Sequence, residues 1–220
     1  MRYRYFLTLL LTLILLAACT ATPPVTEPPT ATPEPSQMPT QIPSPSPTPT
    51  EAPPEPLMLE ETAERVITAL AAKDLVTVAE FAHPERGVRF SPYTYVREDH
   101  LVFTPEELTR LVGSDQVHMW GHYDGTGDPI ELTFDEYFQE FVYSADFANP
   151  EEVAIDEELG WSNMINNITE FYPGSSFVEY HFSGFEEQYQ GMDWESLRLV
   201  FIQEEGTWYL VGIVHDQWTI

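Results

Sequence analysis

The chain has 220 residues and a formal net charge of -27, from 36 Asp and Glu against 9 Lys and Arg. A surface this acidic repels polyphosphates and anionic lipid headgroups, which argues against nucleic acid as a partner. Residues 1–18 hold two bases and no acid, residues 20–57 hold four acids and 14 of the 20 prolines, and residues 58–220 hold 32 acids and 7 bases. Residues 58–220 therefore have the composition of a folded domain, and their number fits one domain.

Residues 1–18 have the pattern of a signal peptide. Arg2 and Arg4 precede an apolar run that ends at Ala18 and is too short to span a bilayer. The following Cys19 completes the sequence LAAC, which resembles the lipobox of bacterial lipoproteins, where the cysteine thiol receives a diacylglycerol. We expect an exported protein anchored by lipid at Cys19 to the extracytoplasmic face of the cell membrane. An ordinary secretory signal with a chance cysteine is the alternative.

The single cysteine limits the chemistry of the domain. Because Cys19 is the only cysteine in the chain, its acylation leaves no thiol for a disulfide, a nucleophile or a thiolate metal site. Residues 19–57 begin with this cysteine and continue as a linker rich in proline and threonine. Such a composition buries too little apolar surface to fold, and at ~3.1 Å per residue it would reach about 100 Å from the membrane. We interpret it as a spacer, with a PxxP ligand as the alternative.

The first part of the domain is predicted to be mainly helical. Apolar residues from Leu59 to Leu70 recur at the spacing of one helix face, which predicts a helix over 58–73. Asp74 is expected to cap a second helix that Pro84 ends. The elements predicted next are a strand over 87–95, a helix over 105–111, a strand over 117–123, a glycine-rich turn over 124–129, a helix after Thr133 and a helix over 163–171.

The end of the domain is predicted to be all strand, over 177–182, 197–202 and 208–214, with the last two joined as a hairpin. Helices first and antiparallel strands last indicate an α+β fold with helices on a curved antiparallel sheet. Both faces of the hairpin are apolar, since Leu199 and Phe201 point one way while Val200 and Ile202 point the other. The second face must be covered either by the stretch 124–173 or by a second subunit, and we favour the homodimer.

The order of elements resembles the NTF2-like superfamily, the cone-shaped fold shared by nuclear transport factor 2, ketosteroid isomerase and polyketide-cyclase relatives. The resemblance rests on 66–70, 73–75, Phe81, 87–90, 197–201 and 208–213. It implies that the ends of the strands line the mouth of a ligand pocket. The long acidic segment in the middle departs from the family, and no catalytic Asp and Tyr set of the isomerase branch matches position by position.

A second resemblance covers the whole domain. It is to a group of bacterial lipoproteins and exported proteins with no assigned activity. The segments that carry it are 83–93, 120–121, 123–125, 179–182 and 215–220.

Seven residues are candidates for a ligand-binding site. They are His83, Arg89, Tyr93, Glu179, His181, His215 and Asp216. Glu179 and His181 lie two apart on one strand face, which is typical of a carboxylate-oriented general base, of two metal ligands completed by His83 or His215, or of a hydrogen-bonded pair. We favour the hydrogen-bonded pair, and we predict no metal and no cofactor.

The other candidates also have alternative interpretations. His215 and Asp216 close the last strand, where they either face a ligand or form an edge against which Trp218 packs. Arg89 is the first candidate for contact with an anionic ligand. Arg89, Arg97 and Arg198 are each expected to pair with a neighbouring acid.

The turn from Asp124 to Asp128 spaces its carboxylates like a calcium loop. An EF-hand, however, needs a ligand where Thr126 stands and glycine where Pro129 stands, so a tight turn is favoured over weak divalent-cation binding. Serine hydrolase and phosphate-loop motifs are absent from the sequence. The favoured function is binding of a small ligand or a protein partner without catalysis. An isomerase, dehydratase or hydrolase that uses a His and Glu pair, and a structural envelope component, are the alternatives.

Overall fold

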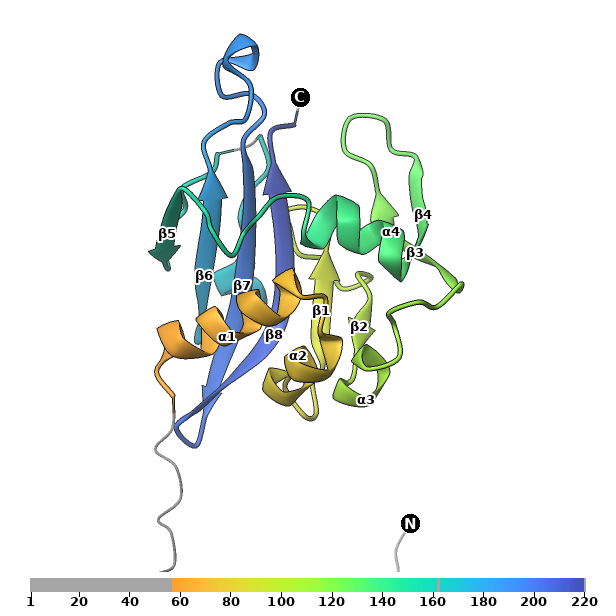
Figure 1. The fold of residues 1–220 in the computed structure, drawn as a ribbon, viewed down its shortest axis with the longest axis vertical. Coiled ribbons are helices and arrows are strands. Elements are labelled where there is room, and N and C mark those ends of the chain that lie inside the picture. The colour runs from red at the N-terminus through yellow and green to blue at the C-terminus, as the bar shows by residue number, and fades with distance from the viewer. Residues whose placement is uncertain (1–56, 162, 220) are drawn as a thin grey trace, which may run out of the picture. The chain divides into compact units, whose positions relative to one another are not determined.

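The computed structural model describes residues 57–161 and 163–219. The signal peptide, Cys19 and the linker up to residue 56 lie outside the described residues. The described chain has a mixed α+β architecture, with helices packed on a curved, mostly antiparallel six-stranded sheet (Figure 1). Within these residues, no helix combines the length and the apolar character needed to cross a membrane.

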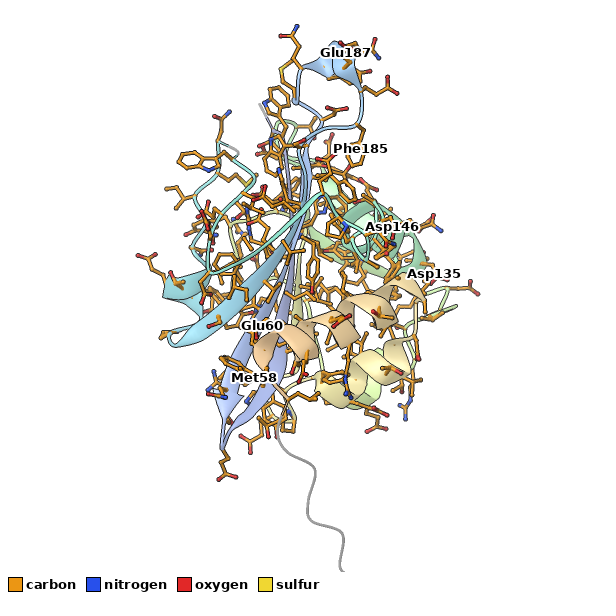
Figure 2. All side chains as sticks on the ribbon, turned by 60° about the vertical axis from the view of Figure 1, so that its left-hand side comes forward. Met58, Glu60, Asp135, Asp146, Phe185 and Glu187 are labelled. Carbon is orange, nitrogen blue, oxygen red and sulfur yellow. The ribbon has the colours of Figure 1, made fainter. Side chains whose placement is uncertain are left out.

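Two helices open the described chain, as predicted. Helix α1, Leu59–Ala71, buries the apolar face that its spacing indicated. Asp74 caps helix α2, Leu75–Phe81, by accepting a hydrogen bond from the backbone N–H of Thr77 at 3.1 Å. Figure 2 shows Met58 and Glu60 at the start of α1. Just beyond the end of α1, the Lys73 ammonium lies 2.7 Å from the Asp135 carboxylate, which ties this end to the middle of the chain.

The six strands run across the sheet in the order β2, β1, β8, β7, β6, β5. Neighbours are antiparallel except β1 and β8, which are parallel. The predicted C-terminal strands are confirmed, and the hairpin is longer than expected. Along the chain, the strands of this sheet are β1 Val88–Ser91, β2 Val102–Phe103, β5 Glu152–Ile155, β6 Ser175–Phe182, β7 Glu195–Glu204 and β8 Thr207–Gln217.

Strand β1 ends earlier than the sequence pattern predicted. The prediction ran from residue 87 to residue 95, but Pro92 has no N–H to donate to a ladder, and the strand stops at Ser91. The edge strands β2 and β5 were not predicted, because each is very short and carries exposed valine or isoleucine rather than an alternating apolar face.

The middle of the chain forms a second layer of short elements. Helix α3, Pro105–Leu108, is followed by a two-stranded sheet of β3, Val117–His122, and β4, Pro129–Thr133, joined by the glycine-rich turn. Thr133 caps α4, Phe134–Tyr137, as predicted, and the helix continues as the π-helix η1, Phe138–Val142. Their aromatic side chains pack in the same core as α1 and α2, with the Trp120 ring stacked on Tyr137 at 3.8 Å between centroids.

The chain itself covers the second face of the sheet. The helix predicted over 163–171 forms only as α5, Ile168–Phe171. Its Ile168 and the following Tyr172 pack on the apolar residues of that face, which are Phe177, Val200, Ile202, Val211 and Val214. Residues of the stretch 124–173 therefore cover the second apolar face of the hairpin. A second subunit is not needed to cover this face, so the homodimer stays a prediction that the apolar hairpin no longer supports.

The loop between β6 and β7 projects beyond the rest of the domain. Figure 2 shows Glu187 at its tip, where the short 3-10 helix η2, Glu187–Tyr189, lies, and Phe185 nearer its base. The Asp193 carboxylate fixes the base of the loop by accepting the backbone N–H groups of Phe185 and Glu186 at 3.0 and 2.7 Å.

Candidate functional site

The second face of the sheet buries a polar cluster beside its apolar half. We use "polar cluster" for the side chains of Thr94, Glu179, Ser196, Arg198 and Asp216 together with the backbone of Gly160. Arg198 in β7 stands directly opposite Glu179 in β6, and both side chains are fully buried. The expectation that Arg198 pairs with an acid is confirmed, and the pairing involves two acids.

All five N–H groups of the Arg198 guanidinium find acceptors. Nε donates to Glu179 Oε2 at 2.7 Å, and Nη2 donates to Glu179 Oε1 at 3.2 Å. Nη1 donates to Asp216 Oδ2 at 2.8 Å and to Thr94 Oγ1 at 2.7 Å. The second hydrogen of Nη2 reaches the carbonyl of Gly160 at 3.3 Å. The guanidinium has therefore no donor left for a ligand.

The charges of the polar cluster hold each other in their ionised forms. Burial by itself raises the pKa of Glu179, but the charge of Arg198 and hydrogen bonds from Arg198, Ser196 and the Gly160 N–H bring that pKa below its ordinary value. Burial lowers the pKa of Arg198, and the charges of Asp216 and Glu179 more than offset this effect. Glu179 is thus a carboxylate bound on several sides rather than a free base.

His181 joins the polar cluster through a serine. Ser196 Oγ donates to Glu179 Oε1 at 2.6 Å, so its lone pair is left to accept from His181 Nδ1 at 2.8 Å. Burial lowers the pKa of His181. The predicted side-by-side Glu179 and His181 are therefore bridged by Ser196, which is closest to the favoured interpretation of a hydrogen-bonded pair.

The other two candidate histidines lie elsewhere. His83 Nδ1 accepts the backbone N–H groups of Glu85 and Arg86 at 3.2 and 3.1 Å, and its Nε2 lies 3.1 Å from Glu204 Oε1. His215 is fully buried on the helical face of the sheet, with its ring edge-on to Phe141 at 5.8 Å. An acid–base pocket built from His83, His215 and the Glu179 pair needs these groups to converge, and in the described structure they do not.

Tyr93 lies apart from the polar cluster, in a pocket of about 450 Å³. The pocket opens between the loop that follows β1, the end of β3 and the segment 163–165. We call it the tyrosine pocket, and its aromatic and polar lining residues are Tyr93, Tyr95, Arg97, His100, His122, Tyr123, Asp124 and Asn163. Of the seven predicted site residues, Tyr93 is the one that lines it.

Arg89 positions a wall of the tyrosine pocket instead of facing a ligand. Its Nη1 donates to the carbonyls of Arg97, Glu98 and His100 at 3.1, 2.9 and 2.6 Å. Its guanidinium also lies over the Phe171 ring, 5.1 Å from the centroid. The expectation that Arg89 pairs with an acid is wrong, because three backbone carbonyls of the loop take its hydrogen bonds. Arg97 does pair with an acid, Asp99.

The opposite wall depends on a bulge in β3. The register of β3 and β4 shifts between Met119 and His122, and Gly121 in this bulge has φ +147°, a conformation that favours glycine. A Cβ on Gly121 would lie 3.3 Å from Pro92, so glycine also allows the two walls to approach. The Tyr93 hydroxyl then accepts the backbone N–H of Asp124 at 3.2 Å, which joins the walls.

The turn from Asp124 to Asp128 connects β3 and β4, as the favoured interpretation predicted. Tyr123 donates its backbone N–H to the carbonyl of Asp128 at 2.8 Å, and Thr126 Oγ1 accepts the N–H of Asp128 at 3.2 Å. Across residues 57–161 and 163–219, no three His, Cys, Asp or Glu side chains are grouped closely enough to hold a metal ion.

His100 lines the tyrosine pocket with an uncharged ring. Its Nδ1 lies 2.7 Å from Ser91 Oγ and 3.3 Å from the backbone N–H of Arg97, so neighbouring loop residues hold the ring in place. Burial lowers the pKa of His100 to about 4, so the ring is uncharged at pH 7. The sequence analysis missed His100 because it lies in a loop where no periodic pattern marks it.

The comparisons with known proteins add no residue role to this geometry. No protein-family model matches the chain. A search of curated proteins found no match either.

Proposed function

We propose that the chain is an exported, lipid-anchored protein whose acidic domain binds a small ligand in the tyrosine pocket without catalysing a reaction. The observation that carries the proposal is a pocket of about 450 Å³ with three tyrosines in its lining. Small-molecule sites commonly have this size and combine aromatic walls with a few placed polar groups. Catalysis receives no support from these groups, since the pKa of His100 is lowered to about 4, far below that of an effective general base at pH 7, and Glu179 is held in the polar cluster.

We also propose that the domain has the NTF2-like cone. Two opening helices on a curved sheet of long C-terminal strands support this assignment. The pocket lies on the rim of the domain formed by the loop after β1 and the end of β3, which is a position compatible with the mouth of a cone. An experimental structure that superposes poorly on NTF2-like domains would remove the assignment and leave the pocket intact.

Ligand binding is testable on the full chain purified without added ligand. We expect native mass spectrometry to show a bound small molecule that is lost in Tyr95→Ala, because Tyr95 lines the pocket and its hydroxyl makes no hydrogen bond to the part of the chain that the structure describes. The matched control is Tyr189→Ala, since Tyr95 is 47% exposed and Tyr189 is 48% exposed on the projecting loop. The proposal is contradicted if the wild-type protein carries no bound small molecule. It is also contradicted if Tyr95→Ala and Tyr189→Ala retain the molecule equally.

The lipid anchor has a separate test. We expect cells that express the chain to incorporate labelled palmitate into the protein, and Cys19→Ser to abolish the labelling because no other cysteine is present. The neighbouring Thr20→Ser serves as the control and should be labelled like the wild type. Labelling that survives Cys19→Ser refutes the anchor at this position.

A further inference from the structure

The tyrosine pocket has an unbalanced negative charge. Asp124 at its rim is exposed, and its carboxylate makes no hydrogen bond or ion pair within residues 57–161 and 163–219. The cation in the lining, Arg97, is already held by both carboxylate oxygens of Asp99, at 2.9 and 3.3 Å. Behind the pocket, Glu140 accepts a hydrogen bond from the Tyr123 hydroxyl at 3.4 Å. The pocket therefore has two nearby carboxylates, Asp124 and Glu140, whose negative charges are not balanced by a cation among the described residues.

The two carboxylates lie close enough to the tyrosines of the pocket to influence them electrostatically. Burial raises the pKa of Tyr93, the hydrogen bond from the Asp124 backbone N–H partly offsets this effect, and the charges of Asp124 and Glu140 add to the increase. Tyr93 and Tyr123 both pack on Phe141, with centroid distances of 5.8 and 6.1 Å, so the two rings share one core neighbour. The faces of aromatic rings attract cations, and the attraction grows when water is partly excluded.

The remaining charges of the pocket also disfavour an anion. His100 is neutral because burial lowers its pKa to about 4, so it adds no positive charge. The whole chain carries -27, and a field of this sign raises the local concentration of cations while it repels anions. A neutral ligand could donate a hydrogen bond to Asp124 but would not gain the attraction between opposite charges.

We propose that the tyrosine pocket binds an organic ammonium cation, with the charged group against the tyrosine faces and the Asp124 carboxylate. This inference rests on the proposed function, because it names the class of ligand for the same pocket. A quaternary ammonium group suits such a site in particular, because it has no N–H that needs a hydrogen-bond acceptor and is attracted by aromatic rings and by a nearby carboxylate.

The test compares two probes that differ in charge and share a shape. Choline and its uncharged carbon isostere 3,3-dimethyl-1-butanol are titrated into the full chain in a nonionic detergent, and heats of binding are measured. We expect choline to bind at least tenfold more tightly than the alcohol. Equal affinities overturn the cation inference but leave a ligand pocket in place. If neither probe binds, the inference is also overturned, whereas a bound mass in the native spectrum would still support the proposed function.

Two matched variants assign the effect to the pocket. Asp124→Asn removes the unpaired rim carboxylate and is expected to weaken choline three- to tenfold while it leaves the alcohol unchanged. Asp128→Asn changes a carboxylate at the other end of the same turn, outside the pocket lining, and should leave choline binding unchanged. If both variants weaken choline equally, the general charge of the domain rather than the pocket attracts it, and the inference fails.

Discussion

Replacing Arg198 by methionine is expected to lower the free energy of unfolding by about 3–5 kcal/mol, the range measured when one partner of a buried ion pair is removed. The variant removes the guanidinium that pairs with both Glu179 and Asp216, which are 0% and 3% exposed. Neither carboxylate can regain water at that depth, so each must take up a proton or force the strands apart. Urea unfolding of the full chain, followed by tryptophan fluorescence, measures the loss.

Two further variants test whether the loss of stability in Arg198→Met comes from the burial of the ion pair and from the charges of the two acids. Arg110→Met removes an arginine that pairs with Glu106 on the surface, where its side chain is 71% exposed, and should cost less than about 1 kcal/mol. Adding Glu179→Gln and Asp216→Asn to Arg198→Met removes the uncompensated charges and should recover most of the lost stability. If Arg198→Met is as stable as Arg110→Met, the polar cluster does not hold the second face of the sheet together.

The parts of the fold that depend on neighbouring residues could be predicted. The apolar spacing of α1, the caps at Asp74 and Thr133, and the hairpin of β7 and β8 each depend on a few consecutive residues. The alternation of side chains along β7 could also have predicted on which face of the sheet Arg198 lies. Since Leu199 and Phe201 face the helices, Arg198 had to lie on the other face, among the apolar residues that α5 covers.

The polar cluster could not be predicted, because its partners are distant in sequence. Thr94 and Arg198 are 104 residues apart, and their 2.7 Å hydrogen bond depends on a loop that has no periodic pattern. Gly160 shows the same limit. A Cβ at this position would lie 2.3 Å from the Trp194 ring and 2.7 Å from Ser196 Oγ, so glycine is required by a close approach that the sequence does not reveal.

The tyrosine pocket was predicted only in part, for a related reason. Tyr93 was a candidate, but the bulge at Gly121 and the loop held by Arg89 decide which other side chains reach the pocket. A bulge shifts the register by one residue and so changes the face on which each later side chain lies. Spacing along the chain does not indicate where such a shift occurs.

Stability is expected to fall as the pH is lowered from about 6.5 towards 4, and His215 should account for about 2 kcal/mol of this loss at pH 5. Burial lowers the pKa of His215 from 6.5 to about 4. The unfolded chain therefore binds a proton at this residue between these pH values and the folded chain does not. The folded state is favoured above the unfolded pKa, and this contribution is lost as the pH falls. His215→Phe keeps a ring against Phe141 and should remove this part of the pH dependence.

The pH window distinguishes His215 from the carboxylates. Glu179 has a lowered pKa in the folded state, so its stabilisation is present above its ordinary value of 4.5 and is lost only below it. Chemical unfolding at pH 7.5 and pH 5 thus reports mainly on the buried histidines. His122→Phe changes an exposed histidine and should keep the wild-type difference between the two pH values. If His215→Phe also keeps that difference, the folded domain accommodates the proton on His215, and the buried ring does not limit stability in mild acid.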